Sequence, residues 1–462
     1  MCKDINDIPV IKTFFYNNKY YLYDTYTNRL LEVSKSQFME IKELKRVGIN
    51  AYLQLDKSTQ SYRDIEMLIN KGMMKYSFIE TIEHPATKYA SYLTERCVSD
   101  ITLQVTKDCN FCCRYCIFAA DSQVARNHEK KHMTWEIAKR TIDYLYDHSK
   151  DAPSIEIGFY GGEPMLNFKL IADVVEYVEQ RFFSKKIRFL MTINGSILTD
   201  DVIDFLVNHD FHIAISFDGP PDVQNRHRKF LETGQGTYDV VYSNIIKIRN
   251  KNIDYFNNNV KFIPVAFEDE NQNVVSKFFK SLNVSEDSII ETMAELNGID
   301  YNINPAEDIL SSDANRRETG MQKYINDYIS IYNDKSVIPV SWHHNGPCVP
   351  SLKKMMVCTD GSFSICEKCL ENQNFLLGNV FDGLNLNRVL QYLNIGKLTD
   401  KECKTCWAMR FCRICALFCM DFEKGEMSHD KKLIACYEIK NRTLEFFKKE
   451  LIDKFELKIE RK

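Results

Sequence analysis

The stretch Val105-Thr106-Lys107-Asp108-Cys109-Asn110-Phe111-Cys112-Cys113-Arg114-Tyr115-Cys116 places three cysteines in the spacing CxxxCxxC. Cys109, Cys113 and Cys116 lie on one short loop, and the aromatic residue Tyr115 precedes the last of them. Three thiolates on such a loop can hold three irons of a 4Fe-4S cube and leave the fourth iron open to another ligand. The alternatives are a cluster used only for electron transfer and a structural zinc site, to which Cys112 would supply the fourth ligand. The spacing favours the open iron–sulfur cluster.

Length and composition narrow the class of protein. The chain has 462 residues, which predicts two or three domains. Charged residues make up 27% and the net charge is −4, so we expect no nucleic-acid partner. The first seven residues lack the apolar core of a signal peptide, and no run of about 18 apolar residues occurs. We therefore predict a cytoplasmic protein that does not bind membranes.

The 16 cysteines are informative in that compartment, because reducing conditions disfavour structural disulfides. Four lie at 109–116 and ten lie between Cys348 and Cys436. Only Cys2 and Cys97 lie apart, and we interpret both as ordinary thiols. The distribution predicts metal binding at two places in the chain.

Strand-like and helix-like segments alternate from residue 101 onward. The predicted strands are Ile101–Val105, Ser154–Tyr160, Lys186–Ile193, His212–Phe217 and Val260–Phe267. The predicted helices are Thr134–His148, Phe168–Phe183, Asp201–Asn208 and Tyr238–Lys251. A further repeat near 270–335 has weaker support. This alternation predicts an α/β fold, an open or partial (β/α)6 barrel whose ligands bind at the carboxyl ends of the strands.

Glycines and short polar residues follow these strands. The polar and glycine candidates are Gly161, Gly162, Glu163, Asn194, Ser216 and Asp218, and Arg228 lies a little further along. Paired glycines allow a backbone to approach a ligand closely. Each residue taken singly is also typical of a strand-end turn, and Arg228 is equally compatible with the surface. Their recurrence at successive strand ends favours a binding site.

The N-terminal residues 10–76 form a separate predicted unit. Aromatic-rich strands flank Asn17-Asn18, a helix follows from about Ser36 to Gly48, and a second helix starts at Ser61. Such a unit is either a peptide-recognition element or a plain packing domain.

The C-terminal cysteines have a spacing of their own. It is Cys348-x12-Gly361-x4-Cys366, then Cys403-x2-Cys406-x5-Cys412-x2-Cys415-x3-Cys419, and finally Cys436. Two zinc knots are one interpretation. The segment Lys431–Lys462 is predicted to be a charged amphipathic helix.

The first cysteine loop resembles that of the radical S-adenosylmethionine (radical SAM) enzymes, and Gly161-Gly162-Glu163-Pro164 resembles their GGEP motif. The resemblance implies that Cys109, Cys113 and Cys116 hold a 4Fe-4S cluster whose open iron chelates S-adenosylmethionine. It further implies that the cofactor is bound by Tyr115, Gly161, Gly162, Glu163, Asn194, Ser216, Asp218 and Arg228. Cys112 is then excluded as a ligand, because it would displace the cofactor.

The C-terminal region is similar to the SPASM extension of radical SAM peptide maturases, with the pattern CX9-15GX4C, CX2CX5CX3C and a last cysteine. The resemblance implies an outer auxiliary 4Fe-4S cluster on Cys403, Cys406, Cys412 and Cys436 and an inner one on Cys348 and Cys366. The pattern breaks at Ala416, where the family has cysteine, so Cys415 and Cys419 are both candidate ligands. Cys358 and Cys369 are surplus, and Cys366-x2-Cys369 is a further chelating pair. One auxiliary cluster is therefore predicted to have three protein ligands and an open iron.

The whole resemblance predicts five segments: a winged-helix-like peptide-recognition element at 1–80, a linker at 81–99, the barrel at 100–335, the SPASM-like region at 336–440 and a terminal helix at 441–462. It looks like the sactipeptide and ranthipeptide maturases, which implies thioether links between cysteine sulfur and carbon in a ribosomally made precursor peptide. A flavodoxin- or ferredoxin-type reductant is implied as a second partner. The alternatives are a sulfatase-maturase-like or carbon–carbon crosslinking enzyme, and a multi-cluster electron-transfer or zinc-binding protein.

Overall fold

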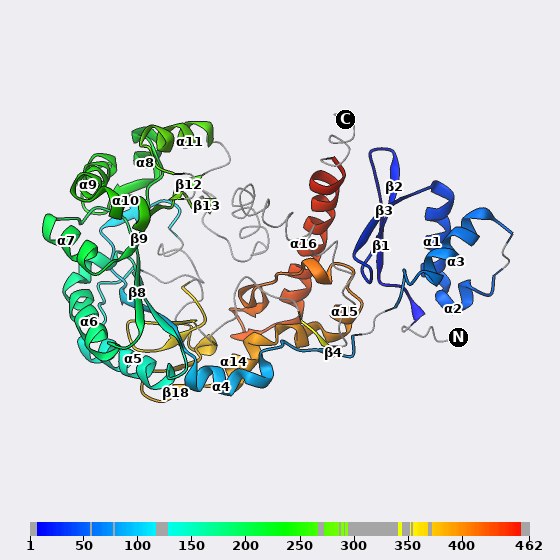
Figure 1. Ribbon diagram of the computed structural model, residues 1–462, viewed down its shortest axis with the longest axis horizontal. Helices are drawn as coiled ribbons and strands as arrows, with labels where there is room; N and C mark the ends of the chain where they lie inside the picture. Colours follow the sequence, from blue (N-terminus) through cyan, green and yellow to red (C-terminus); the bar gives the residue numbers. More distant parts are fainter. Residues whose placement is uncertain are drawn as a thin grey trace.

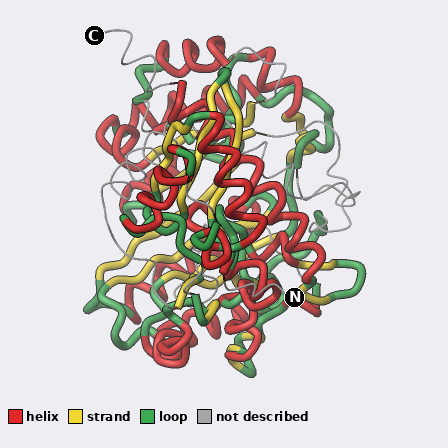
Figure 2. Tube along the Cα trace, turned by 90° about the vertical axis from the view of Figure 1, so that its right-hand side faces the viewer, coloured by secondary structure: helices red, strands yellow, loops and turns green. Residues whose placement is uncertain are grey.

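The computed structural model describes residues 7–55, 58–76, 79–116, 128–266, 272–285, 288–290, 292–293, 341–343, 352, 354–367 and 372–453. The predictions for Cys2, Cys348 and Cys369, and for most of the last barrel repeat, lie outside these residues. Helices and strands are mixed throughout the molecule (Figure 2). Figure 1 shows the β/α region on one side, the small N-terminal sheet on the other, and the C-terminal helices α14–α16 between them.

The central sheet has the order β11-β9-β8-β7-β5-β15-β16, and all neighbouring pairs except β15–β16 are parallel. Its strands are β5 (Asp100–Thr106), β7 (Ser154–Gly161), β8 (Lys186–Ile193), β9 (His212–Ile215), β11 (Val260–Phe262), β15 (Lys354–Val357) and β16 (Phe363–Ser364). This arrangement confirms the predicted α/β class. The strand predicted over 260–267 is divided into β11 and β12 (Val265–Ala266), and β12 pairs with β13 (Thr292–Met293) instead. Pro264 lies at the break and cannot donate a ladder hydrogen bond.

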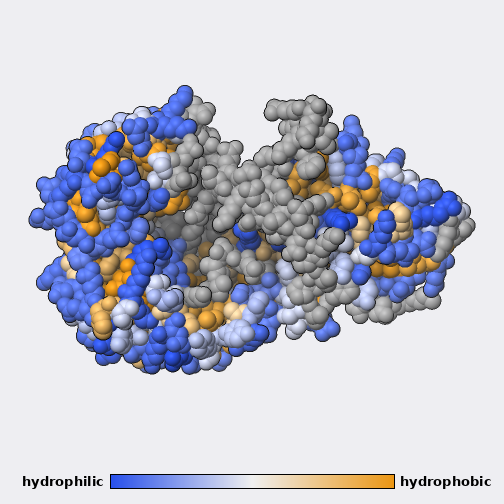
Figure 3. Space-filling model, in the orientation of Figure 1, coloured by the Kyte–Doolittle hydropathy of each residue, from blue (hydrophilic) through white to orange (hydrophobic). Residues whose placement is uncertain are grey.

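Helices follow the strands of this sheet. They are α5 (Trp135–His148), α6 (Phe168–Arg181), α7 (Asp200–Asn208), α8 (Pro221–His227), α9 (Tyr238–Lys251), α10 (Ile253–Asn259) and α11 (Gln272–Ser281). The Thr134 hydroxyl accepts from the Ile137 N–H and caps α5, as its position predicts. Each long helix buries an apolar stripe against the sheet, such as Leu170, Ile171, Val174, Val175 and Val178 of α6. The outer face at the left of Figure 3 is mostly hydrophilic.

The N-terminal unit is a three-stranded antiparallel sheet followed by helices. Its elements are β1 (Ile11–Tyr16), β2 (Lys19–Asp24), β3 (Arg29–Val33), α1 (Lys35–Val47), α2 (Ile49–Tyr52) and α3 (Gln60–Asn70). Asn17 and Asn18 both have positive φ, 47° and 57°, as a tight hairpin turn requires. The predicted helix start at Ser61 is wrong, because the Thr59 hydroxyl accepts from the Tyr62 N–H and starts α3 at Gln60.

The remaining elements precede, connect and follow the strands and helices of this sheet. They are β4 (Thr81–Ile82), η2 (Thr87–Tyr89), α4 (Ala90–Arg96), β6 (Phe111–Cys113), η3 (Pro164–Asn167), β10 (Arg228–Phe230), β14 (Ser341–Trp342), η5 (Gln373–Phe375), β17 (Gly378–Asn379), β18 (Gly383–Leu384), α14 (Leu386–Leu393), η6 (Ile395–Thr399), α15 (Asp400–Lys404), η7 (Met409–Phe411), η8 (Ala416–Cys419), β19 (Met420–Asp421), β20 (Glu426–Met427), α16 (His429–Phe446) and the π-helix η9 (Phe447–Asp453). The Ser428 hydroxyl accepts from the Lys431 N–H and starts α16 at His429, two residues before the predicted start. Among the described residues, no helix is long and apolar enough to span a membrane.

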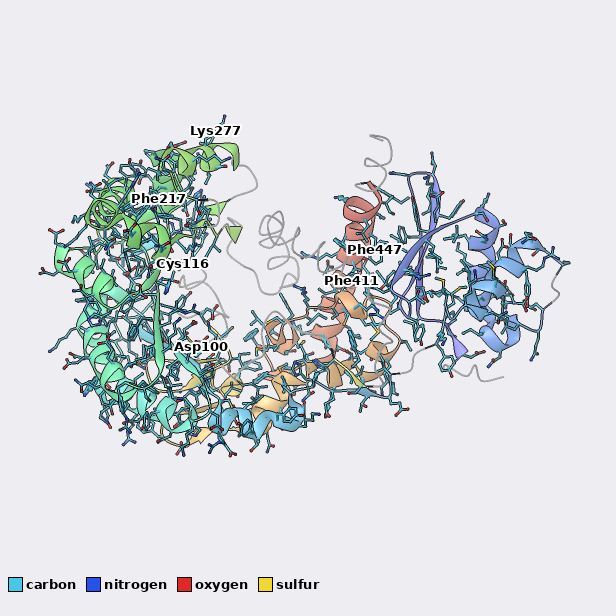
Figure 4. The ribbon with its side chains drawn as sticks, viewed as in Figure 1. Asp100, Cys116, Phe217, Lys277, Phe411 and Phe447 are labelled. Carbon is cyan, nitrogen blue, oxygen red and sulfur yellow. The ribbon has the colours of Figure 1, made fainter. Side chains whose placement is uncertain are left out.

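The N-terminal sheet contacts the segment between Cys406 and Cys412. The Thr25 hydroxyl donates to the Trp407 carbonyl at 3.0 Å. Arg410 donates to the carbonyls of Thr25 at 2.8 Å and Tyr26 at 3.0 Å. Aromatic side chains complete the contact: Phe14, Tyr21 and Tyr23 from the sheet, and Phe411 and Phe447 from the tail, the last two labelled in Figure 4.

Candidate functional site

The first cysteine loop is held by a short antiparallel pairing. β6 pairs with β10, so that Cys113 lies opposite Arg228 and Phe111 lies opposite Phe230. The rings of Phe111 and Phe230 meet edge to face with centroids 5.1 Å apart. Side chains alternate along a strand, and accordingly Cys112 is exposed whereas Cys113 packs against the core. The strand therefore points Cys112 away from Cys113.

The thiols of the loop lie in a buried environment. Burial raises the pKa of Cys109, and nearby Cys113 and Cys116 raise it further. Burial also raises the pKa of Cys113 to about 12, although the nearby Arg228 cation opposes this shift. These cysteines therefore need a cation nearby to become thiolates, and the irons of a cluster would supply that positive charge.

A histidine that the sequence did not single out contacts the loop. The His128 Nε2 lies 3.4 Å from the Cys116 Sγ, and its Nδ1 lies 3.1 Å from the Lys107 carbonyl oxygen. Within the described ranges, no three His, Cys, Asp or Glu side chains form a group that could hold a metal ion. A 4Fe-4S cluster takes each thiolate on a different iron, so its ligands do not converge on one ion as those of zinc do.

The two glycines after β7 lie against the backbone of this loop. A Cβ on Gly161 would lie 2.0 Å from the Thr106 carbonyl oxygen, and one on Gly162 would lie 2.2 Å from that of Asp108. The N–H of Gly162 donates to the Thr106 carbonyl at 3.1 Å, and that of Glu163 donates to the Asp108 carbonyl at 2.8 Å. The close approach expected at this glycine pair is therefore made to the cysteine loop itself.

Glu163 and Asn194 link two strand ends to the same loop. The buried Glu163 carboxylate accepts from the N–H of Asn194 at 2.6 Å and from that of Met165 at 3.1 Å. Burial raises the pKa of Glu163 to about 7 in spite of these two hydrogen bonds. The Asn194 side-chain amide donates to the Asn110 side chain at 2.8 Å. Asn110 was not singled out from the sequence, although it is within the first cysteine motif.

Asp218, Arg228 and Tyr115 form one buried network. The Asp218 carboxylate accepts from Arg228 Nε at 2.9 Å, Arg228 Nη2 at 3.1 Å and the Tyr115 hydroxyl at 2.6 Å. It also accepts from the Val265 N–H at 3.0 Å. Arg228 is only 5% exposed, so the interpretation of Arg228 as a surface residue is wrong. Ser216, which is half-buried, donates through its backbone N–H to the Ile193 carbonyl at 2.8 Å.

Apart from Ser216, the predicted site residues at the strand ends thus contact the first cysteine loop. Cys116 lies beyond the end of β5 and Asp100 at its start, and Figure 4 shows the two apart. Direct contact of these residues with S-adenosylmethionine stays a prediction.

The C-terminal cysteines gather in a second place. Burial raises the pKa of Cys412, and Cys406, Cys436 and Cys403 each raise it further. Burial likewise raises the pKa of Cys436 to about 11, with Cys403 and Cys406 contributing. Because such electrostatic effects act over short distances, the four cysteines predicted for the outer cluster lie near one another.

Cys419 lies near the same group. It is buried, which raises its pKa, and Cys415, Cys436 and Cys403 contribute to that shift. Cys366 follows β16 and packs against the core, and the surplus Cys358 is buried at the end of β15. Because Cys348 and Cys369 lie outside the described residues, the inner ligand set stays a prediction.

Comparisons with known proteins relate part of this chain to a described family. Residues 103–282 match the radical SAM superfamily. An uncharacterized protein of Methanocaldococcus jannaschii is 30% identical to this chain. The match covers 36% of this chain and 58% of that relative. The radical SAM cyclopropyl synthase TigE of Paramaledivibacter caminithermalis is 24% identical over 67% of each chain.

Two further comparisons extend beyond the matched segment. A cysteine-type anaerobic sulfatase-maturating enzyme of Clostridium novyi is 20% identical over 67% of this chain and 84% of its own. The solved structure of native anSMEcpe with bound AdoMet has a TM-score of 0.53 and 17% identity, and the match covers 74% of this chain and 96% of that chain. The structural match shows a shared fold.

Proposed function

We propose, from the premise that this chain is a radical SAM maturase, that it links a cysteine sulfur to a carbon atom within a ribosomally made precursor peptide. The radical SAM family uses S-adenosylmethionine and a 4Fe-4S cluster. Residues Cys109, Cys113 and Cys116 would hold that cluster. The proposal concerns the substrate class and the bond that is formed.

The observation that carries the peptide substrate is the edge of the N-terminal sheet. β3 is the last strand in the order β1-β2-β3, and among the described residues no strand pairs with its outer edge. Peptides commonly bind by adding a strand to such an edge. The unit contacts the segment between Cys406 and Cys412, so a leader bound there is attached to the cysteine-rich tail. This supports a peptide-recognition element over a plain packing domain.

The chemistry then divides between the cofactors and the chain. When bound, the cluster and S-adenosylmethionine supply a 5′-deoxyadenosyl radical, which removes a hydrogen atom from a peptide carbon. The thioether would form between that carbon and a cysteine sulfur, with the thiol proton passing to a base and the surplus electron to an oxidised iron–sulfur cluster, such as the one that Cys403, Cys406, Cys412 and Cys436 would hold. Each link therefore removes two hydrogens from the peptide. The chain's part is to position the carbon and the thiol and to exclude water.

The test is anaerobic co-expression with a small Cys-rich peptide encoded beside this chain, followed by mass spectrometry. We expect the peptide to lose about two hydrogen masses per link and its linked cysteines to resist alkylation. A triple variant Cys109→Ala, Cys113→Ala, Cys116→Ala should form no 5′-deoxyadenosine. Normal cofactor cleavage by that variant would contradict the cysteine assignment.

The second candidate is a sulfatase-maturase-like enzyme, which the match to 84% of the C. novyi relative favours. A carbon–carbon crosslinking enzyme is a related alternative. A carbon–carbon crosslink predicts modified peptides whose cysteines, where present, remain open to alkylation. A two-hydrogen loss with free thiols would therefore replace the thioether proposal with a carbon–carbon link. A protein used only for electron transfer would turn over no S-adenosylmethionine.

A further inference from the structure

Helix α16 carries a lysine that is completely buried. Lys432 is 0% exposed. Its Nζ donates to the Thr399 hydroxyl oxygen at 2.7 Å and lies 3.6 Å from the Cys403 Sγ. Within the described part of the chain, no carboxylate forms an ion pair with it. The sequence offered no sign of this residue, because it lies in a helix rich in surface lysines.

A buried ammonium without a counter-charge is costly, because burial removes several kcal/mol of hydration energy. Buried charges are therefore paired with an anion or bound near one. A hydroxyl and a thiol are the neighbours of Lys432, and a neutral thiol gives no full counter-charge. A thiolate bound to iron would give that counter-charge, because a 4Fe-4S cluster with four thiolate ligands carries net negative charge.

The local geometry directs the ammonium to the outer cysteine group. Lys432 and Cys436 are four residues apart on α16 and so share a face of the helix. The Thr399 hydroxyl accepts from Lys432 and lies 3.2 Å from the Cys403 Sγ. Its own hydrogen is therefore available to that sulfur. Burial raises the pKa of Cys406 and of Cys436, and the charge of Lys432 acts in the opposite direction on both.

We propose that Lys432 is the counter-ion of an iron–sulfur cluster held by Cys403, Cys406, Cys412 and Cys436, and that its charge raises the reduction potential of that cluster. The inference rests on the proposed function, which supplies the cluster. One-electron reduction adds a negative charge to the cluster, and a fixed cation nearby stabilises the reduced form more than the oxidised form. Lys432 is thus a positioning residue that favours acceptance of the electron released when the thioether forms.

The test compares Lys432→Met with Lys431→Met in the full chain with its clusters assembled anaerobically. Methionine keeps the length of the side chain and removes the charge. Lys431 is on the same helical turn but half-buried, so it is a matched control for net charge. Potentiometric titration followed by electron paramagnetic resonance measures the outer cluster, identified as the signal that Cys412→Ala removes. We expect Lys432→Met to lower the reduction equilibrium constant at least tenfold, or about 59 mV for one electron, and Lys431→Met to leave it unchanged.

Equal shifts in the two variants, or no shift in Lys432→Met, would overturn the role of Lys432. If Lys432→Met fails to hold iron, the charge-conserving variant Lys432→Arg distinguishes a role of the charge from a role in packing. Iron retained by the arginine variant supports the counter-ion, whereas iron lost from both shows that the site needs the lysine only for packing. Iron analysis of the unsubstituted chain separates the premise from the inference. About twelve irons with an unchanged potential contradict the inference alone, and about four irons contradict the auxiliary clusters of the proposed function.

Discussion

At the scale of single residues, Asp100 links stability to pH. It begins β5, and one of its carboxylate oxygens is buried with no hydrogen-bond partner among the described residues. Burial raises the pKa of Asp100 to about 7, although Lys354 lies 3.8 Å away. Between about pH 4 and pH 7 the folded chain therefore holds a proton that the unfolded chain has lost, and stability falls as the pH rises through this window.

The Asp100→Asn variant has no carboxyl group at this position to ionise, so its stability should not fall in this way as the pH rises. We expect the variant to gain stability over the unsubstituted chain at about pH 8, on the order of 1 kcal/mol, and little at about pH 5. Anaerobic denaturant unfolding at the two pH values measures the difference. A gain that is the same at both values would show that the pKa of Asp100 is close to its ordinary value.

The sequence points to residues that belong to a regular spacing and misses those that are defined by a distant contact. Cys109, Cys113 and Cys116, and the outer four cysteines, were singled out because cluster ligands recur at short fixed intervals, and their role as ligands stays a prediction. The partners of these residues were not found. His128 lies near Cys116 although 12 positions separate the two in the sequence, and Asn110 meets Asn194, which is 84 positions away. Folding alone creates such contacts.

At the scale of elements, the close fit of the β7 end against the cysteine loop makes Gly162 a sensitive position. A Cβ there would meet the Asp108 carbonyl oxygen at 2.2 Å and its carbon at 2.6 Å, and backbone cannot yield as a flexible side chain can. Gly162→Ala should displace the loop and lower the rate of 5′-deoxyadenosine formation at least tenfold. Gly234→Ala is the control for the added methyl group, because nothing lies within 4 Å of it; the φ of Gly234 is positive, +67°, whereas that of Gly162 is not. Similar rates in both variants would mean that the loop tolerates the displacement.

The strand–helix repeats were predicted to within a few residues where each repeat is regular. The bounds of β8 match the prediction, and α5 and β7 each differ from theirs by one residue. Caps such as Thr134 and hydrophobic periodicity provide these boundaries. The edge of the sheet was not predictable in this way. β15 has the sequence KMMV, which has no period of its own, and its partner is decided by the tertiary fold.

At the scale of the whole molecule, Arg410 joins the N-terminal unit to the tail through two backbone carbonyls. Hydrogen bonds from a charged group are each worth about 1.5–3 kcal/mol. Arg410→Ala should therefore weaken this contact and speed hydrogen exchange at residues 406–412. It should reduce peptide modification more than it reduces cofactor cleavage without peptide.

Lys401→Ala, which removes an exposed cation of α15, is the control for Arg410→Ala. Hydrogen–deuterium exchange mass spectrometry and the two activity assays measure the outcome. Hydrogen exchange and a ratio of peptide modification to cofactor cleavage that are both unchanged in Arg410→Ala would contradict this prediction. They would show that the aromatic contacts of Tyr23, Phe411 and Phe447 hold the N-terminal unit to the tail without Arg410.

The parallel pairing of β5 with β15 also affects how the chain is made. Asp100 leaves the ribosome long before its sheet partner Lys354, and at ordinary rates of synthesis the delay is on the order of tens of seconds. During that interval one edge of β5 has no permanent neighbour, and open strand edges are where nascent chains associate wrongly. We therefore expect the newly made β/α region to gain from transient cover of this edge, by a chaperone or by another segment, until β15 emerges.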